Sequence, residues 1–145
     1  MTAEPIVFPS LAWFEELRRL VNDDSAYRQF GTVDASMGVK IGDGVFVLAF
    51  EAFECTSVRS GSEYDLINVD FFIEMEPASW RAMLESIKCN GGAEAGQTLV
   101  SLDMLNEISN NATGDQLRAD MFFRYNQSLQ HFFDLSANLN TVFAD

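Results

Sequence analysis

The sequence has very few of the residues on which metal sites and most acid–base catalysis depend. Its 145 residues include one histidine and two cysteines. A structural or catalytic zinc site usually needs several His or Cys ligands, so we expect no metal site, and no other motif indicates a cofactor. We predict that His131 lies on the solvated, polar face of a C-terminal helix and has no catalytic role.

The two cysteines, Cys55 and Cys89, do not form a CxxC pair or a disulfide framework. Neither has an obvious basic neighbour in the sequence that would produce a thiolate. We therefore interpret both as reduced thiols that pack as small buried hydrophobic residues, in a cytoplasmic protein.

Basic residues are also scarce, with 9 Lys and Arg against 22 Asp and Glu and a formal net charge of -13. Such a charge repels phosphate backbones and anionic lipid headgroups, so we expect no nucleic-acid partner and no stable membrane anchoring. No apolar run reaches the length of a transmembrane helix, and the first ten residues lack the features of a signal peptide.

Glycine motifs for nucleotides are missing as well. The segment Gly42 to Gly44 lies between two predicted strands and lacks the lysine of a phosphate-binding loop. It is typical of a tight hairpin turn.

Apolar residues, by contrast, are abundant: 48% of the chain is hydrophobic, with 13 Phe and 6 Met. The length indicates one domain over residues 1–145, large enough to bury a sizeable core. Because Phe and Met commonly line adaptable apolar sites, this surplus favours either a thick core or a lined cavity.

The first half of the chain changes from helical to strand periodicity. Ser10 can cap a helix whose apolar residues recur at helical spacing up to Val21. Alternation then predicts a strand from Val33 to Ile41. We expect the next strand over 45–58, apolar on both faces at its start, and a third over 64–75.

The second half returns to helical spacing. Pro77 is predicted at the first turn of a helix that Asn90 to Gly92 ends. The segment 93–109 suits either a strand or a helix, and a final Phe-rich helix begins at about residue 114. This order predicts an α+β fold with helices on one face of a mostly antiparallel sheet.

One predicted strand face carries both charge and an aromatic ring. Asp70, Phe72 and Glu74 share that face of the segment 64–75, so it either is exposed to water or lines a polar mouth. We interpret it as the exposed face of the sheet.

Two segments together resemble the sterol carrier protein family of lipid-binding domains. They are "WFEELRRLVNDD" in the first helix and "NVDFFIEMEPASWRAML", in which an acidic-marked strand leads into a Trp-bearing helix. The resemblance covers roughly Ser10 to Leu105. The matching residues are Val69, Asp70, Phe71, Ile73, Trp80 and Leu84. The segment "GQTLVSLDML" keeps Gly96 and Leu99 but lacks the basic residues and second glycine of the family pattern.

The resemblance implies a five-stranded sheet with helices over one face. It also implies an apolar tunnel for a sterol, fatty acid or acyl-CoA, often capped by the C-terminal helix. The expected function is therefore non-catalytic binding or transfer of a hydrophobic ligand. The candidate ligand-binding residues are Phe72, Met75, Trp80, Met83, Leu84, Phe122 and Tyr125.

Two alternatives remain open. The chain could be a small cone-shaped enzyme of the nuclear-transport-factor-like type, acting on a steroid or polyketide with Asp70 as the base. It could instead be an interaction module that buries the Phe-rich helix in a homodimer.

Overall fold

The computed structural model describes residues 4–30, 33–93, 99 and 116–143, with only the backbone of residues 30 and 116–123. The elements follow in the order β1 (Pro5–Phe8), α1 (Leu11–Asp23), η1 (Tyr27–Phe30), β2 (Ala35–Ile41), β3 (Gly44–Glu51), β4 (Glu54–Gly61), α2 (Asp65–Asn68), β5 (Phe71–Met75), α3 (Pro77–Asn90), α5 (Gln116–Asp134), η2 (Leu135–Asn138) and β6 (Asn140–Phe143).

The main sheet has four strands in the order β4-β3-β2-β5. Strands β2, β3 and β4 form an antiparallel meander, whereas β5 pairs parallel to β2 with Met37 opposite Phe71. A second sheet pairs β1 parallel to β6, with Pro5 opposite Asn140. The prediction of α+β is confirmed, but that of a five-stranded, mostly antiparallel sheet is wrong.

The predicted strand over 45–58 is in fact a hairpin of β3 and β4. The chain reverses at Ala52, which has a positive φ of 54°. The Ala52 carbonyl accepts from Val33 N at 2.9 Å, and the Asp34 carboxylate accepts from Ala52 N at 2.9 Å. These contacts come from another segment, so the local sequence around Ala52 does not reveal the turn.

The predicted strand over 64–75 is also interrupted. The helix α2 occupies its first half, and only Phe71–Met75 is a strand. The Asp65 carboxylate accepts from Ser62 N at 2.8 Å, which fixes the chain just before α2. The short side chain of an aspartate favours such local turns over an extended strand.

The predicted helix ends are confirmed at three positions. The Ser10 hydroxyl accepts from Trp13 N at 3.1 Å at the start of α1. Pro77 opens α3, and Gly91 ends it in the left-handed conformation with a φ of 78°. The helix α5 begins at Gln116, close to the predicted start. Apart from Ala93 and Leu99, the ambiguous segment 93–109 lies outside the described residues.

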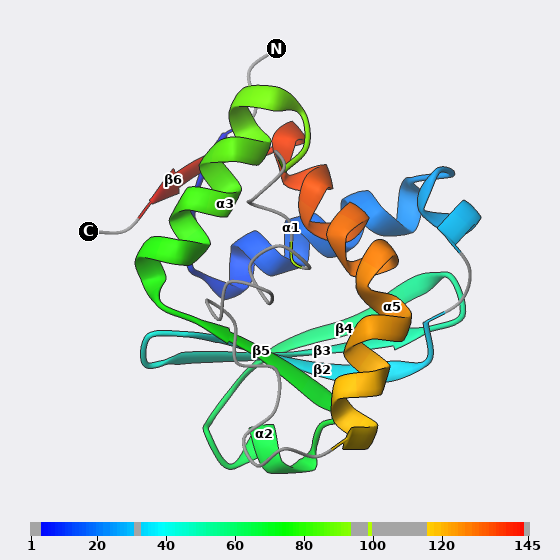
Figure 1. The fold of residues 1–145 in the computed structure, drawn as a ribbon. Coiled ribbons are helices and arrows are strands. Elements are labelled where there is room, and N and C mark those ends of the chain that lie inside the picture. The colour runs from blue at the N-terminus through cyan, green and yellow to red at the C-terminus, as the bar shows by residue number, and fades with distance from the viewer. Residues whose placement is uncertain (1–3, 31–32, 94–98, 100–115, 144–145) are drawn as a thin grey trace.

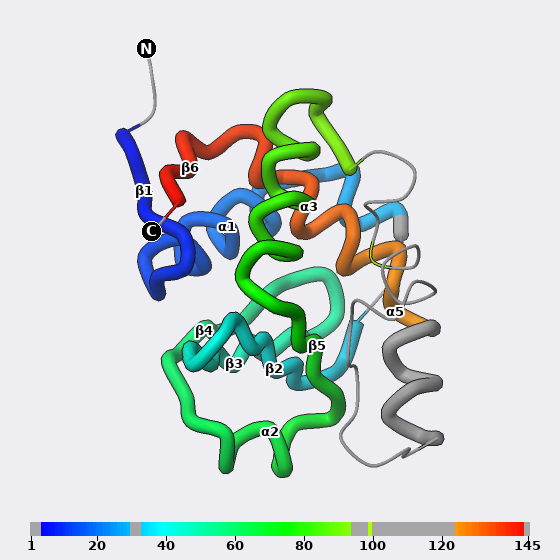
Figure 2. The backbone as a smooth tube through the Cα atoms, turned by 60° about the vertical axis from the view of Figure 1, so that its left-hand side comes forward, coloured from blue at the N-terminus to red at the C-terminus, as the bar shows by residue number. Residues whose placement is uncertain are grey.

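The three long helices α1, α3 and α5 lie together on one side of the main sheet, and α2 lies on the other (Figure 1). In Figure 2 the same helices stack above the strands, while β1 and β6 run side by side next to α1. The helices therefore cover one face of the sheet, as predicted, with α2 as the exception.

Among the residues whose side chains are described, the space between this helical layer and the sheet is filled by the protein's own side chains. The largest fully buried residues there include Trp13, Phe14, Phe71, Trp80, Phe132 and Phe133. The Phe133 ring centroid lies 5.5 Å from Trp80 and 5.3 Å from Phe132. In the part of the chain whose side chains are described, the predicted enclosed cavity is not present.

Candidate functional site

Five of the seven predicted ligand-binding residues come together on the helix-covered side of the sheet. Met75 at the end of β5 and three residues of one face of α3 are buried in the main core; these three are Trp80, Met83 and Leu84. The Trp80 indole N–H donates to the Lys40 carbonyl at 2.9 Å, which fixes α3 against β2. Tyr125 of α5 packs, partly buried, against the same core.

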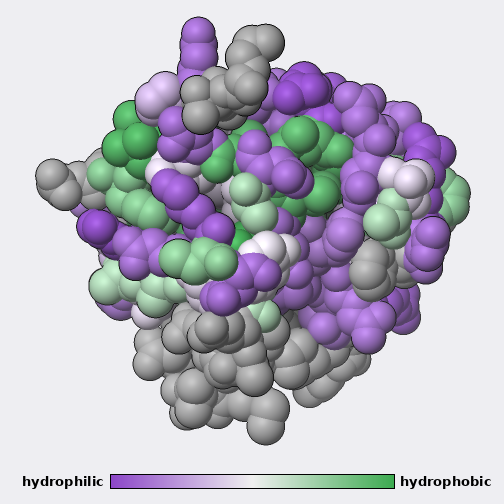
Figure 3. Space-filling model, turned by 90° about the horizontal axis from the view of Figure 1, so that it is seen from above, coloured by the Kyte–Doolittle hydropathy of each residue, from purple (hydrophilic) through white to green (hydrophobic). Residues whose placement is uncertain are grey.

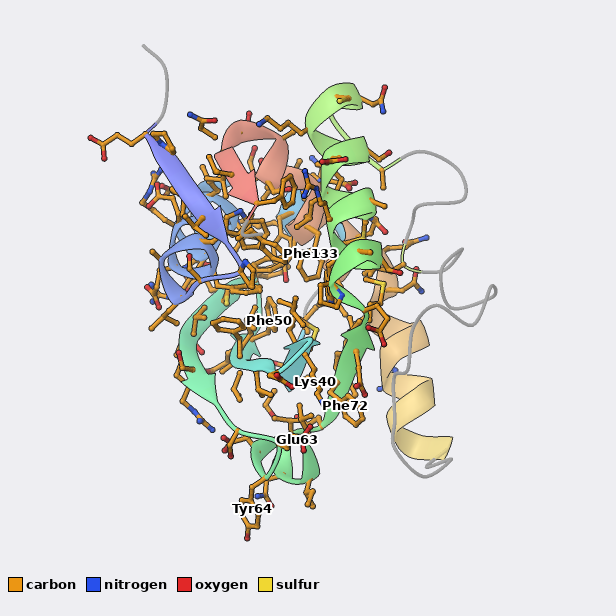
Figure 4. The ribbon with its side chains drawn as sticks, turned by 90° about the vertical axis from the view of Figure 1, so that its left-hand side faces the viewer. Lys40, Phe50, Glu63, Tyr64, Phe72 and Phe133 are labelled. Carbon is orange, nitrogen blue, oxygen red and sulfur yellow. The ribbon has the colours of Figure 1, made fainter. Side chains whose placement is uncertain are left out.

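Phe72 and Phe122 differ from these five. Phe72 is buried with Val45, Val47, Leu66 and Val69 in a second cluster. Figure 4 shows Phe50 and Phe133 on the helix side of the sheet and Phe72 on the side of α2. Since neighbouring strand side chains alternate between faces, one site between sheet and helices can contact Met75 but not Phe72. The side chain of Phe122 lies outside the described residues.

Asp70 is exposed and links two strands. Its carboxylate accepts from Ser36 N at 2.8 Å, and its own N–H donates to the Ser36 carbonyl at 3.0 Å. These bonds hold β5 beside β2. The structure places Asp70 at the surface, where its carboxylate bonds to the backbone of β2. The alternative in which Asp70 acts as a base on a steroid stays a prediction.

The prediction of a solvated His131 is wrong. This side chain is half-buried, with Nε2 2.6 Å from Oδ2 of Asp24. The same carboxylate oxygen accepts from Tyr27 N at 2.9 Å. These contacts join α5 to the end of α1 and the start of η1. Asp24 lies 107 positions away in the sequence, so helical periodicity alone does not reveal the pair.

The two cysteines have different environments. Cys55 is fully buried, as predicted, and burial raises the pKa of its thiol to about 12. Cys89 is exposed near the end of α3, so the prediction that it is buried is wrong. The Cys55 thiol is therefore protonated at neutral pH and is no nucleophile.

The described part of the Phe-rich stripe on α5 is used inside the protein. Leu129, Phe132 and Phe133 are fully buried in the core of the same chain. These three residues are therefore not available for the predicted alternative of a homodimer built on this helix. A dimer formed through other surfaces stays a prediction.

Pockets of two kinds, one apolar and one more polar, open at the surface of the described residues. An apolar pocket of about 270 Å³ is lined by Phe8, Pro9, Ile41, Pro77, Ala78, Arg81 and Phe143. Its one charged group, the Arg81 guanidinium, lies 5.1 Å from the centre of the Phe143 ring. A more polar pocket of about 340 Å³ is lined by Arg28, Glu51, Ala52, Phe53, Glu54 and Thr56. Both combine distant segments, which is why the sequence did not indicate them.

On the α2 side of the sheet, Lys40 lies among acidic side chains. Lys40 forms ion pairs with Glu63 and Glu74, and its hydrogen bond to Glu63 raises the pKa of the Lys40 ammonium.

In the view from above, the surface is mostly hydrophilic and its apolar residues gather in separate patches (Figure 3).

Two further kinds of site are absent from the described ranges. No three His, Cys, Asp or Glu side chains there lie close enough together to hold a metal ion. No helix among these residues combines the length and hydropathy needed to cross a membrane.

Neither the family models nor the curated proteins compared with the chain give a match. Solved structures do. The crystal structure of sterol carrier protein 2 matches with a TM-score of 0.67 and 19% identity, over 90% of this chain and 97% of that chain. The solution structure of a conserved hypothetical protein of Thermus thermophilus, described as possibly a sterol carrier protein, matches with a TM-score of 0.68 and 19% identity, over 97% and 94%. The chain therefore has the fold of sterol carrier protein 2, as the sequence resemblance implied.

Proposed function

We propose that this protein binds a hydrophobic small molecule, a sterol, fatty acid or acyl-CoA, and transfers it without catalysing a reaction. The observation that supports this most is the shared fold, which extends over 97% of the sterol carrier protein 2 chain. The apolar residues gathered between the sheet and the helical layer also favour it. Binding would be driven by removing the ligand from water, at roughly 0.8 kcal/mol per buried CH₂ group.

The proposed site lies between the sheet, α3 and α5. Met75, Trp80, Met83, Leu84 and Tyr125 would contact the ligand. Phe122 is a further proposed contact, while Phe72 could contact only a ligand on the opposite face of the sheet.

Because the described interior is filled, side chains must move apart when the ligand enters. We propose that the layer opens at α5 near Tyr125. Here the tyrosine is only partly buried, whereas Leu129, Phe132 and Phe133 further along the helix are fully buried. The closed, packed form would then be the ligand-free state, and binding would shift the population towards an open one.

Native mass spectrometry of protein purified without detergent tests the proposal. The protein is incubated separately with a sterol, a long-chain fatty acid and an acyl-CoA, and we expect a one-to-one complex with at least one of them. Transfer is then measured between neutral vesicles that carry a fluorescent analogue of that ligand. A protein that stays free of all three ligand classes would contradict the proposed function.

A matched pair of tyrosine variants tests the location. Tyr125→Ala removes a proposed contact, and we expect about 10-fold weaker binding, because the loss of most of an aromatic contact corresponds to about 1.5 kcal/mol. Tyr64→Ala removes a tyrosine that is 72% exposed and points away from the sheet beside α2 (Figure 4), and binding should not change. Equal effects of the two substitutions would refute this location for the site.

A further inference from the structure

Among the described residues, the hydroxyl group of Tyr27 is buried and has no hydrogen-bond partner. Tyr27 is fully buried in the main core at the start of η1. Among the buried side-chain polar atoms of the described residues, only its hydroxyl and Arg18 Nε lack a partner. Arg18 still donates from Nη2 to the Thr56 carbonyl at 3.0 Å, whereas Tyr27 has no second polar group in its side chain.

Such a group destabilises the ligand-free protein. A hydroxyl that leaves water and finds no new partner loses a hydrogen bond without compensation. A phenylalanine would fill nearly the same space without this cost. The hydroxyl of Tyr27 is therefore a packing defect, a site for a buried water, or a group that can bond to a ligand.

The neighbouring polar groups already have other partners. The Asp24 carboxylate accepts from the backbone N–H of Tyr27 and contacts His131 Nε2. The thiol of Cys55 is directed to the Ser57 carbonyl, with a sulfur–oxygen distance of 3.7 Å. Burial raises the pKa of the Tyr27 hydroxyl, so the group is an uncharged hydrogen-bond donor at neutral pH.

Tyr27 packs beside α5, the helix that also carries Tyr125 of the proposed ligand site. Its ring centroid is 6.4 Å from that of His131 on α5. His131 follows Tyr125 by six residues, which corresponds to about 9 Å along a helix. To reach Tyr27, a ligand that enters under α5 at Tyr125 must extend about this far towards the end of the helix and part the buried side chains along this stretch. A sterol skeleton or a long acyl chain is long enough.

We propose that the hydroxyl of Tyr27 donates a hydrogen bond to an uncharged oxygen, a hydroxyl or carbonyl, at the inner end of the ligand. This inference rests on the proposed function and makes it more specific. It selects neutral lipids with one polar oxygen, such as sterols or long-chain alcohols, over hydrocarbons.

Ionised fatty acids are selected against as well. A buried carboxylate needs an opposite charge or several donors, and the Tyr27 hydroxyl offers a single donor. His131, whose ring lies beside that of Tyr27, is already engaged with Asp24.

The variant Tyr27→Phe removes only the hydroxyl and tests the proposal. Binding of a fluorescent sterol with a free 3-hydroxyl, delivered from cyclodextrin, is measured for both proteins. A 3-deoxy analogue of the sterol and palmitate serve as competitors. We expect about 5- to 10-fold weaker binding of the hydroxy-sterol by Tyr27→Phe, unchanged binding of the deoxy analogue, and weak competition by palmitate.

A stability measurement separates a ligand contact from a structural role. Removal of an unsatisfied hydroxyl should leave the melting temperature of the free variant equal to or above that of the wild type. Tyr64→Phe, at an exposed tyrosine, is the matched control and should change neither property.

Three results would overturn the proposal. Unchanged sterol binding by Tyr27→Phe would make the hydroxyl a packing defect. Equal weakening for the hydroxy-sterol and the deoxy analogue would show that the hydroxyl acts through the protein structure and not through a bond to the ligand's oxygen. If neither protein binds any of the ligands, the proposed function fails, and this inference fails with it. In the first two cases the carrier function stands.

Discussion

The substitution Thr141→Val should weaken the contact that holds the C-terminal strand to the first helix. The Trp13 indole N–H donates to Thr141 Oγ1 at 3.0 Å between positions 128 residues apart, and both side chains are buried. Valine has nearly the shape of threonine but no acceptor. The substitution therefore leaves the indole N–H of Trp13 buried and unpaired, while the packing volume stays nearly constant.

The expected loss of unfolding free energy is about 1–3 kcal/mol, the cost of an unsatisfied buried donor. For a domain of this size, each kcal/mol lowers the melting temperature by roughly 2–4 °C, so we expect a decrease of about 2–12 °C. A domain typically has a stability of about 5–15 kcal/mol, and the variant should still fold.

Thr141→Ser is the matched control, because it keeps the hydroxyl and removes one methyl group, at about 0.8 kcal/mol. Urea and thermal unfolding, followed by circular dichroism, give the free energies, and an unchanged slope with urea shows that the unfolding transition is the same. A Thr141→Val variant as stable as Thr141→Ser, or more stable, would refute the reasoning. A cycle that adds Trp13→Phe measures the coupling between the two side chains directly.

Two further predictions concern titratable groups. In native protein at pH 8, exposed Cys89 should react rapidly with a thiol reagent, so one thiol per chain is modified. Burial raises the pKa of the Cys55 thiol to about 12, so Cys55 should react only after unfolding. Two rapidly reacting thiols per chain would contradict the burial of Cys55. The hydrogen bonds from Arg59 and from Ser62 lower the pKa of the Asp65 carboxyl below its unfolded value. Its contribution to stability is therefore present above the unfolded pKa of about 4 and is lost as the pH falls through the folded pKa. Asp65→Asn should accordingly be less stable than the wild type at pH 7, with a smaller difference in strong acid, and a difference that does not depend on pH would count against this role.

The sequence predicted the features that depend on near neighbours. The cap at Ser10, the helix start at Pro77 and the helix end at Gly91 each depend on a backbone conformation or hydrogen bond within a few residues. The strand around Val39 was visible because alternation repeats within the strand itself. The resemblance then indicated the fold, which the solved structures confirm.

The sequence could not predict which faces come together. Phe72 and Met75 are both apolar residues of one strand, but the sequence pattern does not show that both faces of this edge strand are covered, one by α2 and one by α3 and α5. The parallel pairing of β5 with β2 depends on where the connection through α2 crosses, and this is a property of the folded chain.

The sequence by itself determined the start of α1, both ends of α3, the alternation in β2, the net charge and the abundance of apolar residues. Each of these depends on residue type and short-range spacing. Only the tertiary structure decided that the main core is packed by its own rings, that His131 contacts Asp24 and that the Tyr27 hydroxyl has no partner among the described residues. These features depend on contacts between segments far apart in the chain, whose geometry is fixed only when the helices pack on the sheet.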